Sequence, residues 1–421
     1  LFINFKDFKI VIKIKMFKFN RLTKLIAIFL GLVLFNPSTI FANKIINCKS
    51  CSSEKNSSEN KRLEQISKLW DRNFIPQKIK KDLLGIGINS TFYWMACRNK
   101  PMKKIDILQH KTALEDGWDY FTFIVCVDDL FDEQHDLNIN RVKFLLRRLK
   151  DDLNYLGLIN SDKTVMISLK GEEKVKPKPS SGLNELVFTR KYENNPKLRK
   201  SFLKLWEKFE NKFNNNSNIV FNLYNEPNYR AFGEPQGAKL WFDEAEKIIN
   251  SIRKINPQRT IMVEGTNKSL FRRYGLDIMK KVNFNNIIYG YHYYPYSGSR
   301  FKKKTSKINR SKLETMNAEN SILLVNHSIK NEMPIILSEV AAHSPFKDKK
   351  GKVIKGMSEN DYMFFIKSIK KNFFSRGIGL TWWGLYSRQS TPYKRLPSTK
   401  ENNKNIEDIS FKTYVNILVK N

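Results

Sequence analysis

Two glutamates occupy comparable places in the chain, each at the end of a short apolar run. Glu226 lies in the tripeptide Asn225-Glu226-Pro227 after the run that begins at Ile219, and Glu339 follows Ile335-Ile-Leu-Ser338. Packing alone does not favour glutamate there, because an unpaired buried carboxylate costs free energy. Two carboxyl groups that face each other can cleave a glycosidic bond, since one protonates the leaving oxygen while the other attacks the anomeric carbon or activates water. Either glutamate taken alone could belong to a surface loop, so the interpretation depends on the pair.

Aromatic and imidazole side chains gather at the ends of two further runs. One run ends in Tyr291-His292-Tyr293-Tyr294, and another ends in Trp382-Trp383. Aromatic rings offer large apolar faces on which the C–H faces of sugars can pack, and a strand points only one of two adjacent residues to a given face. We expect Trp383 to form the floor of a sugar site, with Trp382 as the alternative. These residues, His292 included, could instead be ordinary core.

The elements that must position these groups follow from a regular alternation of short β-rich runs and longer amphipathic segments. Near-continuous apolar runs are typical of parallel strands buried on both faces, and strand–helix repetition implies right-handed crossovers. The predicted strands are Leu84–Tyr93, Tyr120–Val127, Thr164–Leu169, Asn218–Asn225, Thr260–Glu264, Asn286–His292, Pro334–Val340 and Ile378–Trp383. The predicted helices are Asp106–Glu115, Asn140–Leu156, Pro196–Phe213, Gly237–Ile255, Lys312–Lys330 and Glu359–Phe374.

Eight such units predict a single α/β catalytic domain with the (β/α)8 TIM-barrel fold. A doubly wound open sheet is the alternative, but it needs a glycine-rich phosphate turn after an early strand, and the stretch Gly85-Ile-Gly87 is too short. Functional groups of barrels lie at the C-terminal ends of the strands. Glu226 and Glu339 end the fourth and seventh runs, so they should face each other across the barrel mouth.

The ordered set of motifs resembles glycoside hydrolase family 5, the cellulase and mannanase type of retaining glycosidase. The resemblance covers about residues 84–395 and is carried by Asn225-Glu226-Pro227, His292-x-Tyr294, Ser338-Glu339 and the tryptophans of the eighth run.

This resemblance implies roles for six residues. Glu226 would be the acid/base and Glu339 the nucleophile of a retaining mechanism, which places the carboxyl groups about 5–5.5 Å apart. The implied substrate-binding residues are Asn225, His292, Tyr294 and Trp383. Asn225 would bond the sugar 2-hydroxyl, and Tyr294 would orient Glu339. This mechanism needs no cofactor, and the five histidines show no metal-ligand spacing.

Two positions depart from the family pattern. The family usually carries an arginine on strand two, where this chain has Thr122, and a histidine at the end of strand three, where this chain has Lys170. The arginine normally bonds the nucleophile and helps to keep it ionised. Lys170 could supply part of that charge. The departures place the chain in a divergent branch and raise a second hypothesis, a non-catalytic or weakly active glycan-binding barrel.

The first 42 residues have the layout of a secretory signal peptide. Basic residues precede the apolar run 25–35, and a small residue at position 42 follows. An uncleaved anchor is the alternative, but eleven residues are too few to span a bilayer. Translation should start at Met16. We expect a polar segment with a helix over 43–83, a glycoside hydrolase domain over 84–421, and a secreted or periplasmic protein, whose four cysteines permit two disulfides.

The net charge of +34 first suggests a polyanionic partner. The leader carries seven of the basic and one of the acidic residues, so the remaining chain has 68 basic and 40 acidic residues and a net charge of +28. No nucleic-acid-binding motif accompanies the charge, and export separates the protein from cytoplasmic nucleic acid. We therefore expect a polysaccharide or oligosaccharide substrate, with anionic glycans or a cell surface as secondary partners, and no stable membrane span after cleavage of the leader.

Overall fold

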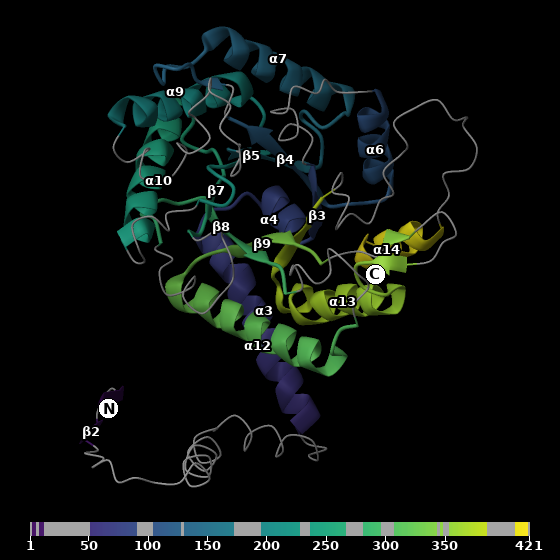
Figure 1. Ribbon diagram of the computed structural model, residues 1–421. Helices are drawn as coiled ribbons and strands as arrows, with labels where there is room; N and C mark the ends of the chain where they lie inside the picture. The colour runs from purple at the N-terminus through teal and green to yellow at the C-terminus, as the bar shows by residue number, and fades with distance from the viewer. Residues whose placement is uncertain are drawn as a thin grey trace, which may run out of the picture. The chain divides into compact units, whose positions relative to one another are not determined.

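The computed structural model divides the chain into two compact units, Leu1–Asn60 and Lys61–Asn421 (Figure 1). The structure describes residues 2–5, 8–11, 51–90, 104–127, 130–171, 195–227, 236–266, 281–295, 307–342, 346–347, 353–384 and 409–419. In the first unit, β1 (Phe2–Phe5) pairs with β2 (Phe8–Val11) in antiparallel fashion. The apolar run 25–35 of the predicted leader lies outside the described residues.

The second unit is built on a closed barrel of eight parallel strands. Its strands are β3 (Ile86–Ser90), β4 (Tyr120–Cys126), β5 (Thr164–Lys170), β6 (Ile219–Asn222), β7 (Ile261–Glu264), β8 (Ile287–Tyr293), β9 (Ile335–Val340) and β12 (Gly379–Trp382). Each strand pairs with its sequence neighbour, and β12 closes the barrel by pairing with β3, with Leu380 opposite Ile86. The predicted TIM barrel is confirmed, and the open-sheet alternative is wrong.

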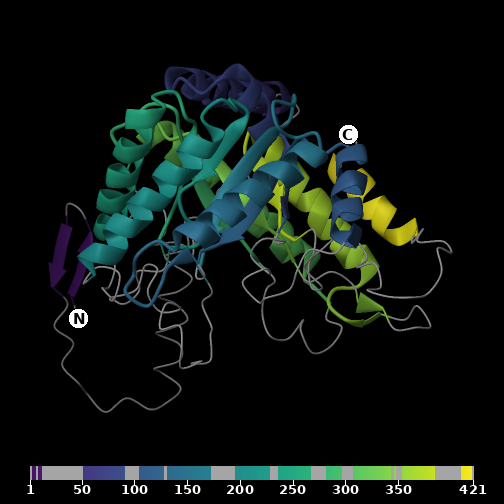
Figure 2. The same ribbon diagram turned by 90° about the horizontal axis from the view of Figure 1, so that it is seen from above.

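Helices between the strands form the outer layer of the barrel (Figures 1 and 2). They are α6 (Lys104–Glu115), α7 (Ile139–Tyr155), α9 (Pro196–Phe213), α10 (Gln236–Ile255), α12 (Arg310–Asn331), α13 (Glu359–Asn372) and α14 (Ile409–Val419). The first six match the predicted helices to within a few residues. Several begin at a side-chain cap, since Asn138, Asn195, Asn309 and Ser358 each accept a backbone N–H of the first turn.

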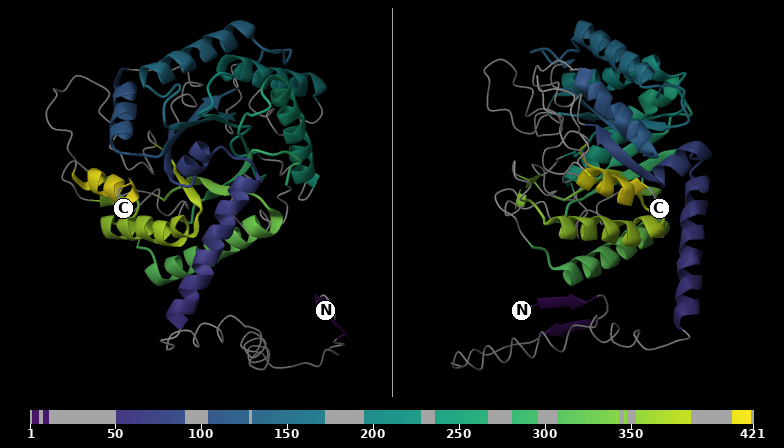
Figure 3. Two further views of the ribbon diagram at one scale, coloured as in Figure 1. Left: turned by 180° about the vertical axis from the view of Figure 1, so that it is seen from behind. Right: turned by 90° about the vertical axis from the view of Figure 1, so that its right-hand side faces the viewer.

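Two helices precede the barrel, where a single one was expected: α3 (Cys51–Arg72) and α4 (Gln77–Leu83). A backbone hydrogen bond holds the end of α3 against the start of β8. The N–H of Asn286, just before β8, donates to the carbonyl of Asn73, just after α3, at 2.6 Å. Asp82 of α4 accepts the backbone N–H and the hydroxyl of Thr164 at 2.8 and 2.7 Å. These contacts lie at strand starts, so the end of α3 and α4 cover the barrel end opposite the predicted site (Figure 3).

Strand alternation decides which side chains fill the barrel interior. Near the N-terminal ends of the strands, the ring of Tyr120 fills the space beside Gly87. A Cβ added to Gly87 would lie 2.3 Å from that ring. The Tyr120 hydroxyl forms a hydrogen bond of 2.6 Å with Thr381 Oγ1 of β12, on the far side of β3. On the neighbouring strand β5, Thr164 lies opposite Tyr120, and Ser168 and Lys170 follow on the same face four and six residues further along. The interior therefore changes from aromatic to polar toward the C-terminal ends of the strands.

Small elements complete the described part of the second unit. They are the antiparallel pair β10 (Phe346–Lys347) and β11 (Val353–Lys355) and the short 3-10 helix η5 (Phe374–Arg376). Cys126, the last residue of β4, is disulfide-bonded. Among the helices that the structure describes, none combines the length and the apolar character needed to cross a bilayer.

Candidate active site

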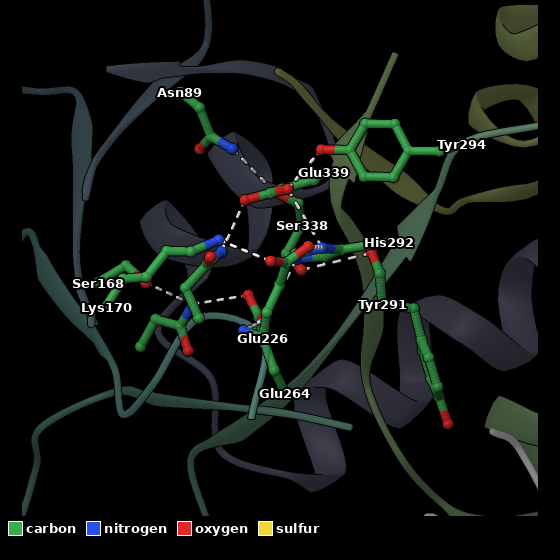
Figure 4. Close-up of polar contacts among 12 residues, drawn as sticks. Asn89, Ser168, Lys170, Glu226, Glu264, Tyr291, His292, Tyr294, Ser338 and Glu339 are labelled. Atoms are coloured by element: carbon green, nitrogen blue, oxygen red, sulfur yellow. Dashed lines mark hydrogen bonds and ion pairs between the residues drawn. The ribbon is translucent and has the colours of Figure 1, made fainter. Parts of the chain in front are cut away.

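Charged and polar side chains converge at the C-terminal ends of β5 to β9 (Figure 4). They include five of the six residues predicted from the sequence, namely Asn225, Glu226, His292, Tyr294 and Glu339. One carboxylate oxygen of Glu226, one of Glu339 and a ring nitrogen of His292 lie within 4.8 Å of one another. Two carboxyl groups this close match the spacing of about 5–5.5 Å for direct nucleophilic attack and fall short of the 6.5–9.5 Å or so that leaves room for a water between them.

A β-bulge places Glu339 in the site. On β9, Leu337 pairs with Tyr291, and Glu339 pairs with the very next residue of β8, His292, so Ser338 is an extra residue in the ladder. The pairing of β9 with β12 shows the same extra residue, because two steps along β12, from Leu380 to Trp382, match three steps along β9, from Leu337 to Val340. Regular alternation would turn Glu339 outward, because Ser338 already faces inward, where its hydroxyl contacts the carbonyl of Tyr291 at 3.4 Å. The bulge turns both side chains inward.

Glu226 reaches the site through a backbone conformation that is unusual for glutamate. Its φ is +60°, in the left-handed region that costs a residue with a Cβ about 1 kcal/mol or more. Its backbone N–H donates to the carboxylate of Glu264, with a distance of 2.9 Å to Oε2. A hydrogen bond to a charged acceptor is stronger than one between neutral groups, so Glu264 stabilises the conformation that aims Glu226 at the site.

His292 lies between the glutamates. Its Nδ1 is 3.1 Å from Glu226 Oε1 and 3.1 Å from Glu339 Oε2, while its Nε2 is 3.1 Å from Glu264 Oε2. The imidazole is fully buried. Burial lowers the pKa of His292, but the carboxylates of Glu339 and Glu264 outweigh that effect and raise the pKa to about 10. His292 is therefore an imidazolium at neutral pH.

Lys170 forms an ion pair with Glu226, and its Nζ lies 2.6 Å from Glu226 Oε2. The sequence suggested that this ammonium compensates for charge missing beside Glu339, but its close partner is the other glutamate. Burial raises the pKa of Glu226, but Lys170 and His292 outweigh that effect and hold the pKa of this carboxyl well below its usual range.

Glu339 has the opposite electrostatic environment. Its carboxylate accepts a hydrogen bond from Asn225 Nδ2, 2.6 Å from Oε1, and another from the hydroxyl of Tyr294 to Oε2. Burial, opposed by His292 and assisted by the Glu226 carboxylate, raises the pKa of Glu339 to about 7. Burial together with Glu339 raises the pKa of Tyr294 well above its usual value, so Tyr294 stays a donor.

A metal ion could use the same three donor residues, because their atoms lie within 4.8 Å of one another. The ammonium of Lys170, 2.6 Å from Glu226, would repel such a cation. His292 Nδ1 also already contacts both carboxylates. We therefore interpret the cluster as an ionic network of carboxylates, imidazolium and ammonium.

Comparison with known proteins agrees with this geometry. Residues 92–386, well over half of the chain, match the cellulase family, glycosyl hydrolase family 5. The chain belongs to glycosyl hydrolase family 5. No curated protein matched its sequence.

Solved structures show the same fold at low sequence identity. A hyperthermophilic endo-β-1,4-glucanase in complex with substrate is 18% identical, with a TM-score of 0.59, over 80% of this chain and 98% of that chain. Thermotoga maritima Cel5A in complex with mannotriose is 15% identical, with a TM-score of 0.59, over 80% and 98%. The cellulose synthase subunit Z of Clostridioides difficile is 18% identical, with a TM-score of 0.58, over 79% and 99%.

The two tryptophans at the end of the eighth strand, Trp382 in β12 and Trp383 directly after it, point to different sides of the barrel wall. Trp382 is fully buried and packs edge-on against Tyr362 and Phe365 of α13, in the layer between barrel and helices. Trp383 is partly exposed, and the ammonium of Lys170 lies 5.9 Å from the centre of its ring. Trp383, and not Trp382, is thus the tryptophan beside the site.

Thr122, which replaces the usual family 5 arginine, lies on β4 with its side chain buried. Its hydroxyl has no hydrogen-bond partner among the described residues. Threonine can therefore not reproduce the charge that an arginine brings to the nucleophile. Burial and the neighbouring carboxylates raise the pKa of Glu339, and threonine adds no positive charge that would oppose them.

Glu264 is the site residue that the sequence did not single out. It is fully buried at the end of β7, where Asn222 Nδ2 donates to its Oε1 at 2.7 Å and the Glu226 N–H to its Oε2. Gly290 makes room for it, because an added Cβ there would lie 2.9 Å from Glu264 Cγ. The sequence could have predicted Glu264 as a site residue, because it ends the fifth apolar run just as Glu226 and Glu339 end theirs.

Proposed function

We propose that this family 5 protein is a retaining glycoside hydrolase that cleaves a β-linked polysaccharide of the glucan or mannan type. The observation that carries the proposal is the pair of glutamate carboxylates within 4.8 Å of each other at the ends of β6 and β9. That spacing suits a double displacement, in which one carboxylate attacks the anomeric carbon directly.

In the proposed mechanism Glu339 is the nucleophile and Glu226 the acid/base. Glu339 attacks the anomeric carbon while Glu226 protonates the leaving oxygen, and a water activated by Glu226 then hydrolyses the glycosyl-enzyme. Asn225 holds Glu339 through Nδ2, and its buried Oδ1 has no partner among the described residues, which leaves an acceptor for the sugar 2-hydroxyl. Trp383 offers its ring to the sugar face.

The substrate class rests on two comparisons. One similar structure is an endo-β-1,4-glucanase and another holds mannotriose, so β-linked glucans and mannans are the first substrates to try. The test is a panel of such polysaccharides, with reducing-sugar release measured and the first-formed anomer assigned by NMR. We expect products of retained β-configuration. Absence of release, or an α-anomer as the first product, would contradict the proposal.

A second candidate function is that of a non-catalytic glycan-binding barrel. Thr122 in place of arginine favours it, because the nucleophile loses a positive neighbour. The same panel separates the two functions when polysaccharide binding is measured alongside release. Binding without any release of reducing sugar would favour the second.

We also propose that the protein is exported. The signal-peptide pattern of residues 1–42 and the disulfide at Cys126 support this, because disulfides are typical of exported proteins. Sequencing the N-terminus of the protein recovered from the medium or periplasm should give Asn43 as the first residue.

The proposed roles predict an unusual acid limb in the pH–rate profile. Glu339 must be ionised to attack, and its pKa is raised to about 7. With a dinitrophenyl glycoside, whose leaving group needs no protonation, kcat/KM should fall about tenfold per pH unit below this value. Lys170 lowers the pKa of Glu339, so Lys170→Met should move the limb to higher pH. Lys239→Met, an exposed change on α10, is the control, and an unmoved limb in Lys170→Met would contradict the assignment.

A further inference from the structure

His292 makes contacts with three carboxylates through its two ring nitrogens. Nδ1 lies 3.1 Å from oxygens of both Glu226 and Glu339, and Nε2 lies 3.1 Å from Glu264. From β8 the imidazole connects the ends of β6, β7 and β9, and its side chain is fully buried. The imidazole is thus shielded from bulk water, and these carboxylates are the proton acceptors in contact with it (Figure 4).

The proposed hydrolysis needs a proton on Glu226 at the moment the leaving group departs. The structure opposes that, because Lys170 Nζ lies 2.6 Å from Glu226 Oε2 and stabilises the ionised carboxylate. Glu226 at rest is thus an acceptor without a proton. The second oxygen, Oε1, faces His292 Nδ1 at 3.1 Å. A donor for the missing proton is therefore already in hydrogen-bond contact.

We propose that His292 stores the catalytic proton on Nδ1 and passes it to Glu226 Oε1 as the glycosidic bond breaks. The proposal rests on the proposed function. In the first step the Nδ1–H bond breaks, Glu226 takes that proton and delivers it to the leaving oxygen, and the C1–O bond is exchanged for a bond from C1 to Glu339. In the second step water attacks C1, Glu226 takes the proton of the water and returns it to Nδ1, and Glu339 leaves as a carboxylate.

The contact between His292 and Glu339 couples the proton to the nucleophile. The charge of Glu339 is one of the interactions that keep the imidazolium protonated, together with Glu264 and Glu226. When Glu339 forms its bond to C1, it loses its negative charge, and the buried imidazolium loses one of the carboxylates that stabilise it. The proton then moves to Glu226 in the step that needs it. Hydrolysis restores the charge on Glu339 and draws the proton back.

Glu264 is a positioning residue in this scheme. Its Oε2 lies 3.1 Å from His292 Nε2, and this negative charge favours a proton on Nε2, so in the proposed scheme Nδ1, which is hydrogen-bonded to Glu226, is the nitrogen that gives up its proton. The same carboxylate accepts the backbone N–H of Glu226 and so holds the proton acceptor in place. The charged or titratable groups of the described residues that face His292 and its partners are Lys170, Glu226, Glu264, Tyr294 and Glu339.

Two substrates with the same sugar and different leaving groups test the proton store. Protonation of the leaving group contributes about 100- to 10,000-fold to the rate, but a dinitrophenolate leaves without it. For His292→Gln, compared with wild type at the optimum of each pH profile, we expect kcat/KM on a β-linked oligosaccharide to fall about 100-fold or more. On the dinitrophenyl glycoside it should fall less than about fivefold. His327→Gln on α12 is the matched control and should change neither value.

The pH profile of Glu264→Gln provides a second test. Loss of this carboxylate removes a group that raises the pKa of His292, so the proton leaves Nδ1 at lower pH. The alkaline limb on the oligosaccharide should move down by about one pH unit or more, since one unit corresponds to one modest charge interaction. Glu244 is a buried carboxylate of α10 away from the site, so Glu244→Gln is the matched control, and its alkaline limb should stay in place.

The outcomes separate this inference from the proposed function. Equal losses on both substrates in His292→Gln, or an unmoved alkaline limb in Glu264→Gln, would overturn the proton store while leaving the hydrolase intact. A wild-type protein that cleaves neither substrate would overturn the proposed function itself. Circular dichroism on each variant identifies a loss that is due to misfolding, and His292→Asn then replaces the misfolded variant.

Discussion

Glu339→Gln is expected to abolish turnover of both the β-linked oligosaccharide and the dinitrophenyl glycoside. An amide cannot form the glycosyl-enzyme, and loss of a group that reacts covalently costs about 10,000-fold or more in kcat. A good leaving group does not help, because the attack on the anomeric carbon itself is lost. Initial rates with both substrates measure the effect.

The fold should survive this change, because glutamine has nearly the size of glutamate. Asn225 and Tyr294 both donate to the carboxylate, and an amide has one acceptor oxygen for these two donors. One buried donor is left unpaired, at a cost of about 1–3 kcal/mol in the free energy of unfolding. Thermal melting checks that cost. Glu319→Gln, at an exposed position of α12, is the control, and wild-type rates in Glu339→Gln would rule out Glu339 as the nucleophile.

The sequence predicted the barrel because its local and global signals agree. Apolar runs of strand length alternate with amphipathic segments that begin at asparagine or serine caps, as in α9 and α12. Parallel strands must then carry their C-terminal ends to one face. The order of strand-end residues along the chain was therefore sufficient to bring Glu226 and Glu339 together.

Other parts of the site depend on geometry that single residues do not encode. The bulge at Ser338 turns Glu339 inward against the alternation rule, and the left-handed φ of Glu226 aims its side chain. Both features are backbone properties that depend on neighbouring strands. The partner of Lys170 is similar, because its charge acts on both Glu226 and Glu339, and only the folded structure shows that the ion pair of 2.6 Å is with Glu226.

Glu226→Ala is expected to separate substrates by their leaving groups. On a β-linked oligosaccharide kcat/KM should fall about 1,000-fold, within the range for loss of an acid catalyst. On the dinitrophenyl glycoside the first step should remain fast, because the phenolate leaves unprotonated. Hydrolysis of the glycosyl-enzyme then lacks its base, so a burst of one dinitrophenolate per enzyme should precede a slow steady state. Stopped-flow absorbance measures the burst.

A small anion should restore the second step in this variant. Azide needs no base, and Lys170, which loses its contact with Glu226, presents a positive charge where the anion must enter. The product should be a glycosyl azide of retained β-configuration. Glu319→Ala should show neither a burst nor azide activation, and a Glu226→Ala variant without either behaviour would contradict its role as the acid/base.

The proton path joins this prediction to the role of His292. If Glu226 receives its proton from Nδ1, the two residues act in series on one proton, and effects of residues that act as a unit do not add. Glu226→Ala combined with His292→Gln should then lose little more on the oligosaccharide than Glu226→Ala alone. Multiplicative losses would mean that the two residues act on separate steps. The contact of 3.1 Å between Nδ1 and Oε1 favours the single path.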